Sequence, residues 1–270
     1  MRAFSSIFPT KKPVIGMIHL LALPGTPKYQ HNSIQAIIDH ALEEARIYKA
    51  AGIDALAIEN MHDVPYLKND VGHEITAIMA IVASAVKKES RLPCGIQVLA
   101  AANKSALGIA LAAKLDFIRA EGFVFGHLAD EGYIDSNAAE LLRYRKMIGA
   151  EHIAIFTDIK KKHSSHAISQ DVNLLETAKA AEFFLTDGLI VTGNSTGKTA
   201  DLDEVAILHQ QTKSPVLVGS GVTIDNVEQY CSICDGMIVG SHFKKQGYWE
   251  NPLDKDRIAR FMDKVGQLRS

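Results

Sequence analysis

The 270-residue sequence is poor in cysteine, in net charge and in long apolar runs, and each shortage excludes a class of protein. Three cysteines are too few for a disulfide framework and are typical of a reducing compartment. The formal net charge is only −2, so no global basic field favours a nucleic-acid partner. No apolar run approaches the length of a transmembrane helix. We therefore expect a cytoplasmic protein without a transmembrane segment.

The first 13 residues contain three basic residues and no acidic one. They match a mitochondrial transit peptide only weakly, because the stretch is short and Pro9 and Pro13 would break a helix there. We interpret residues 1–13 as a lead-in to the first strand, with the mitochondrial matrix as the alternative to the cytoplasm. No linker or low-complexity tract divides the chain, so one domain over residues 1–270 is expected.

Short, nearly continuous apolar runs alternate with longer segments of helical period along the whole chain. Such runs are typical of parallel strands buried on both faces, and apolar stripes such as Ile75, Met79 and Val82 are typical of helices that cover a sheet. Eight units of this kind predict a single (β/α)8 TIM barrel rather than a doubly wound sheet, which usually opens with a glycine-rich turn. The strands are expected at Val14–Leu20, Ala55–Asn60, Cys94–Ala100, Asp116–Glu121, His152–Ile159, Gly188–Gly193, Pro215–Gly221 and Gly236–Ser241.

Charged residues occur where several of these strands end, which is where TIM barrels carry their working residues. We expect Glu59, Asp158 and Lys160 to perform acid–base chemistry, with Arg119 as a further catalytic candidate. Asp158 and Lys160 are the preferred proton-transfer pair, because residues i and i+2 of a strand share a face. The alternative is a structural layer of ion pairs that closes the barrel.

Glycine-rich loops follow the sixth, seventh and eighth expected strands. A phosphate needs several converging backbone N–H groups, and glycines allow the chain to approach it closely. These loops therefore predict a phosphate site, with tight turns alone as the alternative. The candidates for binding substrate or phosphate are His19, Asn60, Thr192, Gly193, Asn194, Gly197, Gly219, Ser220, Gly221, Gly240 and Ser241.

The sequence contains no zinc signature, since the lone Cys231-x-x-Cys234 pair lacks a second pair of ligands. No organic cofactor is expected, and Mg²⁺ held by strand-end carboxylates stays open. The long segment Gly122–Ser136 is rich in glycine and aromatic residues and is expected to form a lid or a subunit contact. Exposed barrel helices commonly pair, so a homo-oligomer is also open.

Several stretches together resemble the BtpA/SgcQ family over nearly the whole chain. The resemblance implies a TIM barrel of the ribulose-phosphate-binding type. It implies two functional directions, because BtpA-like members are associated with photosystem I assembly and SgcQ-like members with sugar metabolism and a nucleosidase label. The matching stretches include GMIHL…LPGTP (16–27), GIDA…ENMHDVPY (52–66), FIR (117–119), ADEG (129–132), DIKKKH (158–163), VTGNSTG (191–197), PVLVGSGVT (215–223) and DGMIVGS (235–241).

Two functional hypotheses follow from these features. The first is an enzyme that acts on a small phosphorylated ligand, a sugar or nucleoside phosphate, as a lyase, an isomerase or a nucleosidase-type hydrolase. The second is a non-enzymatic factor for the assembly or stability of a membrane protein complex, with Gly122–Ser136 as the contact. The first is favoured, because an assembly factor has no physical need of strand-end charges or phosphate loops.

Overall fold

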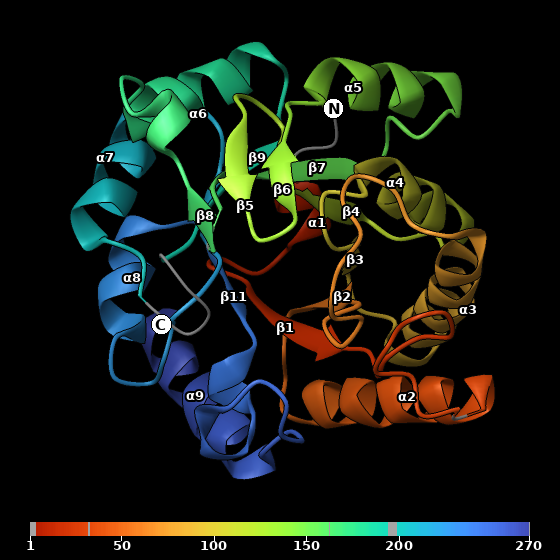
Figure 1. Ribbon diagram of the computed structural model, residues 1–270. Coiled ribbons are helices and arrows are strands. Elements are labelled where there is room, and N and C mark those ends of the chain that lie inside the picture. The colour runs from red at the N-terminus through yellow and green to blue at the C-terminus, as the bar shows by residue number, and fades with distance from the viewer. Residues whose placement is uncertain (1–3, 32, 162, 194–198, 270) are drawn as a thin grey trace.

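Eight parallel strands close into a barrel in the computed structural model, which describes residues 4–31, 33–161, 163–193 and 199–269 (Figure 1). Each strand pairs with the next barrel strand along the chain, and the last pairs with the first. The predicted (β/α)8 barrel is thereby confirmed. The strands are β1 (Val14–His19), β2 (Ala55–Glu59), β3 (Cys94–Gln97), β4 (Phe117–Ala120), β7 (Ala154–Lys160), β9 (Gly188–Val191), β10 (Val216–Val218) and β11 (Gly236–Val239).

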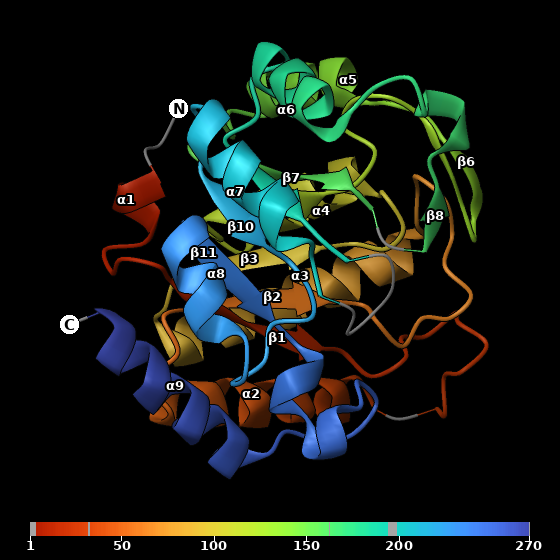
Figure 2. The ribbon, with the colours of Figure 1, turned by 90° about the vertical axis from the view of Figure 1, so that its left-hand side faces the viewer.

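Helices surround the barrel and pack their apolar sides on the outward faces of the strands (Figures 1 and 2). In α3 the buried residues include Ile75, Met79 and Val82, as the helical spacing predicts. The helices are α1 (Phe4–Ile7), α2 (Ile34–Ala50), α3 (His73–Ser90), α4 (Asn103–Ala112), α5 (Ala138–Met147), α6 (Leu174–Phe183), α7 (Leu202–Gln211), α8 (Val227–Ile233) and α9 (Lys255–Arg269), with short 3₁₀ turns at Ala167–Ser169, Ser241–Phe243 and Lys245–Gly247.

Several strands end earlier than the apolar runs predict. β3 ends at Gln97 rather than Ala100, and β10 ends at Val218 rather than Gly221. The backbone of Gly221 has a φ of 70°, which turns the chain out of the extended conformation. The glycines of the predicted phosphate site therefore lie in loops beyond the strands, at the end of the barrel that we call the mouth.

The opposite, N-terminal end of the barrel is filled by aromatic rings. Glycines make room for them: a Cβ on Gly95 would stand 2.1 Å from the ring of Phe117, and one on Gly188 would stand 2.7 Å from Phe156. Phe8 packs on both rings, with ring centroids 5.7 and 6.1 Å away. The lead-in segment thus plugs this end. It also contains α1, a single turn that ends before Pro9, so the expectation of no helix there is wrong.

Four aspartates tie neighbouring strands together at the N-terminal end. Each aspartate lies just before the start of a barrel strand. One of its carboxylate oxygens accepts a hydrogen bond, at 2.8–2.9 Å, from a backbone N–H at the start of the barrel strand one earlier in the chain. Each also faces a basic side chain. These bonds fix the relative position of strand pairs. The aspartates and their basic partners are Asp54 with Arg269, Asp116 with Lys87, Asp187 with Arg145, and Asp235 with His209.

A small antiparallel sheet lies over part of the mouth, at the end opposite to α1 (Figure 2). The segment expected to be a long loop forms a hairpin of β5 (His127–Ala129) and β6 (Gly132–Ile134). β8 (Ser164–Ser165), from the loop after β7, pairs with β5. Two loops of the barrel are therefore joined above β4 and β7.

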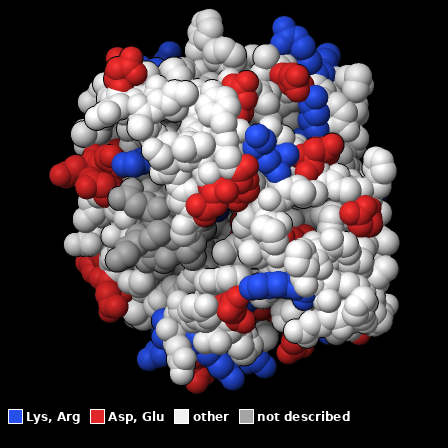
Figure 3. Space-filling view, in the orientation of Figure 1, with Lys and Arg blue, Asp and Glu red and all other residues white. Residues whose placement is uncertain are grey.

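Acidic and basic side chains are interspersed on the face of the molecule that carries the mouth (Figure 3). Among the described residues, no helix combines the length and apolar character needed to cross a bilayer.

Candidate functional site

A layer of buried polar side chains crosses the inside of the barrel near its mouth. The strand register places His19 of β1 beside Glu59 of β2, and Glu59 beside Gln97 of β3. Arg119 of β4 belongs to the same level, and each of the four side chains is at most 5% exposed. Burying so many polar groups costs free energy unless they are paired or serve a ligand. This layer is therefore the first part of a candidate site.

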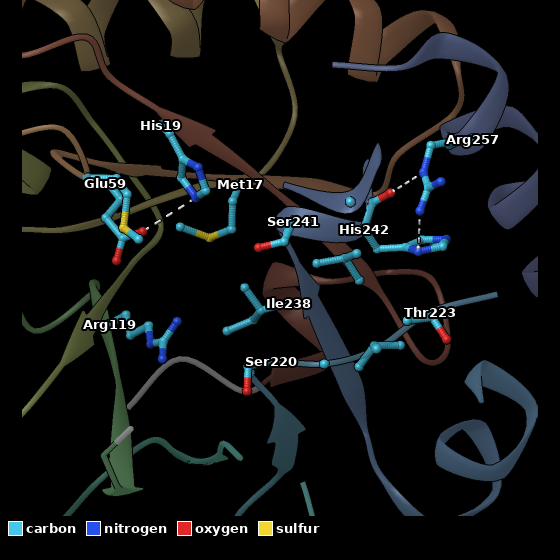
Figure 4. A pocket seen from close by; sticks show the side chains of 17 residues that line it. Met17, His19, Glu59, Arg119, Ser220, Thr223, Ile238, Ser241, His242 and Arg257 are labelled. Atoms are coloured by element: carbon cyan, nitrogen blue, oxygen red, sulfur yellow. Dashed lines mark hydrogen bonds and ion pairs between the residues drawn. The ribbon is translucent and has the colours of Figure 1, made fainter. Parts of the chain in front are cut away.

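A cavity of about 150 Å³ lies beside this layer (Figure 4). His19, Glu59 and Arg119 line one side of it. The loops after β10 and β11, residues 219–223 and 240–242, line the other side. The structure thus brings together charged side chains and glycine-rich backbone around a single space.

The glycine-rich loops contribute residues 219–223 and 240–242 to the lining of this cavity. A Cβ on Gly219 would stand 2.6 Å from the side chain of Ile190, so only glycine lets the chain pass there. Among the described residues, none accepts a hydrogen bond from the amides of Gly221, Val222 or Ser241. These three amides therefore have no acceptor among the described residues, and they can bond water or an anion.

Arg119 and Asp158 form a bidentate ion pair at the mouth. Arg119 Nε and Nη2 donate to the two carboxylate oxygens of Asp158 at 2.7 and 2.9 Å. Burial would lower the pKa of Arg119, but the Asp158 carboxylate raises it above its ordinary value. Arg119 therefore stays a cation at the edge of the cavity, with its direction fixed by Asp158.

His19 and Glu59 form a second close pair on the same side. His19 Nε2 lies 3.6 Å from Glu59 Oε2, and both side chains are about 5% exposed. An imidazole beside a carboxylate is a common arrangement in general acid–base catalysis. Because both side chains line the cavity, this pair could exchange a proton with a bound molecule.

A second guanidinium, Arg257 at the start of α9, lines the cavity on the side of the glycine-rich loops. Its Nε donates to the backbone oxygen of His242 at 2.7 Å, which fixes the 3₁₀ turn after β11. Burial, reinforced by Arg257, lowers the pKa of His242 to about 4, so this imidazole is neutral near pH 7. Sequence reasoning missed Arg257, because it lies some 16 residues beyond the loop that it supports.

The expectation that Asp158 and Lys160 share a face of their strand is wrong. A bulge interrupts β7 between them, so that Asp158 is level with Ile190 inside the barrel and Lys160 with Val191 outside it. Lys160 Nζ donates to both carboxylate oxygens of Glu204 on α7, at 2.7 and 2.8 Å. The two residues are therefore no proton-transfer pair in this structure.

Other predicted binding residues lie apart from the 150 Å³ cavity. Asn60 braces two loops, since its Oδ1 accepts from the amide of Leu99 and its Nδ2 donates to Asp63. Thr192 and Gly193 line a separate cavity beside Lys160. Asn194 and Gly197 lie outside the described residues.

Lys161 forms a buried pair with Glu121, and Lys161 was not among the predicted catalytic residues. Lys161 Nζ lies 3.1 Å from Glu131 of the hairpin and 3.7 Å from Glu121, and its side chain is 8% exposed. Burial raises the pKa of Glu121. The three consecutive lysines 160–162 were a visible signal, but the bulge that decides which of them faces inward cannot be read from the sequence.

Within the described ranges of the chain, no three His, Cys, Asp or Glu side chains are grouped so that they could hold a metal ion. The Cys231-x-x-Cys234 pair lies at α8, and burial raises the pKa of Cys234 to about 12. That thiol is therefore protonated near neutral pH and a weak nucleophile.

Comparison with known proteins adds a family and a fold. A family model described as the BtpA family matches residues 10–267. An uncharacterized mitochondrial protein of Caenorhabditis elegans is 46% identical, with 98% of this chain and 97% of that protein aligned. The photosystem I biogenesis protein BtpA of a Synechocystis strain is 32% identical, over 96% of this chain and 90% of that protein.

Among solved structures, a thiamine phosphate pyrophosphorylase from Pyrococcus furiosus has the same fold with a TM-score of 0.57. The two chains are 14% identical, and the match covers 95% of this chain and 96% of that one. At this identity the likeness concerns the barrel alone.

Proposed function

The chain belongs to the BtpA family, and from the mouth of its barrel we propose that it is an enzyme that acts on a small phosphorylated molecule by acid–base chemistry. The observation that carries this proposal is the shared cavity. Residues whose backbone amides have no described acceptor line one side of it, and a buried histidine, a carboxylate and a guanidinium line the other.

In this proposal the phosphate binds at the loops after β10 and β11. The amides of Gly221, Val222 and Ser241 supply N–H donors, Arg257 supplies positive charge beside them, and Arg119 adds positive charge from across the cavity. Converging amides bind a dianion without a specific side chain, and two guanidinium groups add charge-assisted bonds. TIM barrels frequently hold phosphate after strands 7 and 8, which are β10 and β11 here.

The reacting part of the molecule then faces His19, Glu59 and Arg119. The His19–Glu59 pair moves a proton, and Arg119 stabilises negative charge on an oxygen of the reacting group. Asp158 holds Arg119 in place through the bidentate bond. Proton transfer beside a stabilised oxyanion is the chemistry that isomerases and lyases of sugar phosphates require.

The size of the cavity favours a sugar phosphate over a nucleoside phosphate. At about 150 Å³ it has half the volume of the smallest typical sites for drug-sized ligands, which start near ~300 Å³. A small sugar phosphate comes closer to this volume than a molecule that combines a base, a ribose and a phosphate. We therefore favour a lyase or isomerase of a small sugar phosphate over a nucleosidase.

Two names among the similar proteins point in different directions. The pyrophosphorylase that shares the barrel is named for a phosphate compound, in keeping with the proposal. The Synechocystis relative is named for photosystem I biogenesis, which favours an assembly factor as the second candidate. The hairpin would offer that partner Phe125, Leu128 and Tyr133, which are 39, 54 and 44% exposed.

Thermal unfolding with phosphate compounds tests the proposal. Inorganic phosphate and four- to six-carbon sugar phosphates should raise the unfolding temperature, since a ligand at about 100 times its Kd stabilises a fold by about 2.7 kcal/mol. Gly221→Asp should abolish the rise, because it places a carboxylate at the anion.

Gly149→Asp is the matched control, because Gly149 also has a positive φ, 68°, and open space around it, far from the mouth. It carries the same backbone strain and should keep the response. No response of the wild type to any phosphate compound would reject the proposal and leave the assembly factor.

The compartment and the assembly state stay predictions. We expect the cytoplasm, with the mitochondrial matrix as the alternative, and the word mitochondrial in the name of the C. elegans relative supports the latter. A homo-oligomer is tested by light scattering on the purified protein.

A further inference from the structure

We propose that a second, smaller cavity under the hairpin receives the far end of the phosphorylated substrate, and that Lys161 binds an oxygen atom there. The inference rests on the proposed function and deepens it, because it assigns the substrate a hydroxyl or carbonyl group at a distance from its phosphate. The sequence does not predict this cavity, and the proposed phosphate site does not include it.

The two cavities are neighbours across a single ion pair. Arg119 lines the 150 Å³ cavity, and Asp158, to which it is bonded, lines the second one. Lys161, His127 and His166 line this second cavity as well. A molecule that passes Arg119 from the phosphate loops would therefore meet these side chains next.

Lys161 has hydrogen-bonding capacity to spare. The bulge in β7 directs Lys160 outward to α7, and Lys161 lies inside the mouth, close to Glu121 and Glu131. An ammonium group has three N–H donors. Among the described residues, one hydrogen bond engages them, to Glu131 Oε2 at 3.1 Å, since Glu121 at 3.7 Å is beyond bonding distance.

His127 is the second observation. It is 6% exposed, and no described residue bonds its Nε2. Burial, reinforced by Lys161, lowers the pKa of His127 to about 4, so the ring is neutral near pH 7. A buried ring nitrogen without a partner costs free energy, and a ligand oxygen in the cavity would satisfy it.

The size and charge of the second cavity define what it takes. Its volume is about 30 Å³, room for one or two water-sized groups and too small for a ring or a phosphate. Glu121 and Glu131 lie close to the Lys161 ammonium, and Asp158 also lines the cavity, so this surrounding negative charge disfavours an anion. A neutral hydroxyl or carbonyl oxygen fits both conditions.

The hairpin contributes His127 of β5 to the lining of this cavity, and Glu131, in the turn before β6, accepts the hydrogen bond from Lys161. It therefore takes part in recognition, beyond covering the mouth. Because β8 pairs with β5, the loop that carries Lys161 and the hairpin hold each other in register.

Isothermal titration of the full chain with three kinds of probe tests the inference. The probes are inorganic phosphate, glycerol 3-phosphate as the short ester, and four- to six-carbon sugar phosphates. The wild type should bind at least one of the longer sugar phosphates more tightly than the two short probes. Lys161→Met should weaken that ester by about 10- to 100-fold, the effect of one charge-assisted hydrogen bond, and leave inorganic phosphate unchanged.

Lys160→Met is the matched control, because it removes the adjacent lysine on the outward side of the bulge. Lys160→Met should change neither the affinity for the longer sugar phosphates nor the affinity for inorganic phosphate. His127→Phe keeps a ring and removes the nitrogens, and it should weaken the longer ester in the same way if Lys161→Met does not fold.

The outcomes separate this inference from the proposed function. Normal binding of the longer sugar phosphates by Lys161→Met and His127→Phe overturns the subsite and leaves the phosphate site standing. Equal affinity of the wild type for short and long esters overturns it as well. Failure of the wild type to bind inorganic phosphate or any ester overturns the proposed function itself.

Discussion

The two ends of the barrel both contain acidic residues, half-buried at the N-terminal end and buried at the mouth, and the two ends use them differently. At the N-terminal end, Asp54, Asp116, Asp187 and Asp235 each bond a backbone N–H of the neighbouring strand and face a basic side chain. At the mouth, Glu59 and Asp158 contact side chains and line cavities. The first arrangement fixes strands to each other, and the second leaves polar surface open to a ligand.

Packing differs in the same sense. Aromatic rings fill the N-terminal end, where Phe8, Phe117 and Phe156 meet over glycines. The mouth keeps unbonded amides around a 150 Å³ cavity. This chain therefore packs one end of the barrel closely and leaves polar surface around a cavity at the other, in keeping with the division between stability and binding that TIM barrels allow.

The largest expected effect is on stability alone. Phe156→Ala removes a ring from the N-terminal plug and should lower the free energy of unfolding by about 3–5 kcal/mol, because the closely packed interior leaves a cavity. The increase in unfolding temperature caused by a phosphate compound should persist. Urea unfolding with and without inorganic phosphate measures both quantities.

Phe183→Ala is the control for this variant, because Phe183 is 82% exposed and its loss should change the free energy of unfolding by less than about 0.5 kcal/mol. If Phe156→Ala folded but gave no phosphate response, the two ends would be coupled and the comparison would fail.

The N-terminal end is also the part that the sequence predicts best. Apolar runs and helical stripes report burial on strands and helices, so the eight strands and the barrel follow from them. The glycines after β10 and β11 are equally readable, because close approach of a backbone requires them. Gly219, Gly221 and Gly240 do line the cavity.

The side chains of the mouth are less predictable, because their directions depend on tertiary structure. One inserted residue in β7 exchanges the roles of Lys160 and Lys161, and no local pattern announces it. Arg257 and His127 reach their cavities from separate elements, α9 and the hairpin. Charge at a strand end identifies a candidate, but only the strand register and the neighbouring loops show which cavity it faces.

A matched pair of variants tests the division of roles directly. Asp158→Asn at the mouth and Asp187→Asn at the N-terminal end each remove a carboxylate from a buried arginine, Arg119 or Arg145. Each should lower the free energy of unfolding by about 1–3 kcal/mol, because an ionised group loses its partner. Only Asp158→Asn should abolish turnover, since Arg119 faces the cavity.

Turnover is measured as uptake of deuterium from D₂O into the sugar phosphate that binds, followed by NMR. Asp187→Asn should exchange at the wild-type rate and Asp158→Asn should not. If Asp158→Asn exchanged deuterium at the wild-type rate, neither Asp158 nor its orientation of Arg119 would be needed for the reaction.

The smallest effect per variant at neutral pH concerns the pH dependence of stability. The pKa of buried His127 at the mouth is lowered to about 4, whereas an unfolded histidine titrates near ~6.5. Between these values the unfolded chain binds a proton that the folded chain excludes, so stability falls as pH falls, by at most about 1.4 kcal/mol per pH unit. Below the folded pKa both states are protonated and this contribution levels off.

His127→Gln should reduce the slope between pH 6.5 and 4 in urea unfolding series, whereas His152→Gln, which replaces an exposed histidine at the N-terminal end, should not. An unchanged slope in His127→Gln would mean that the His127 ring takes up a proton in the folded protein as readily as in the unfolded chain. The ring could then not be the neutral partner that the hairpin subsite requires.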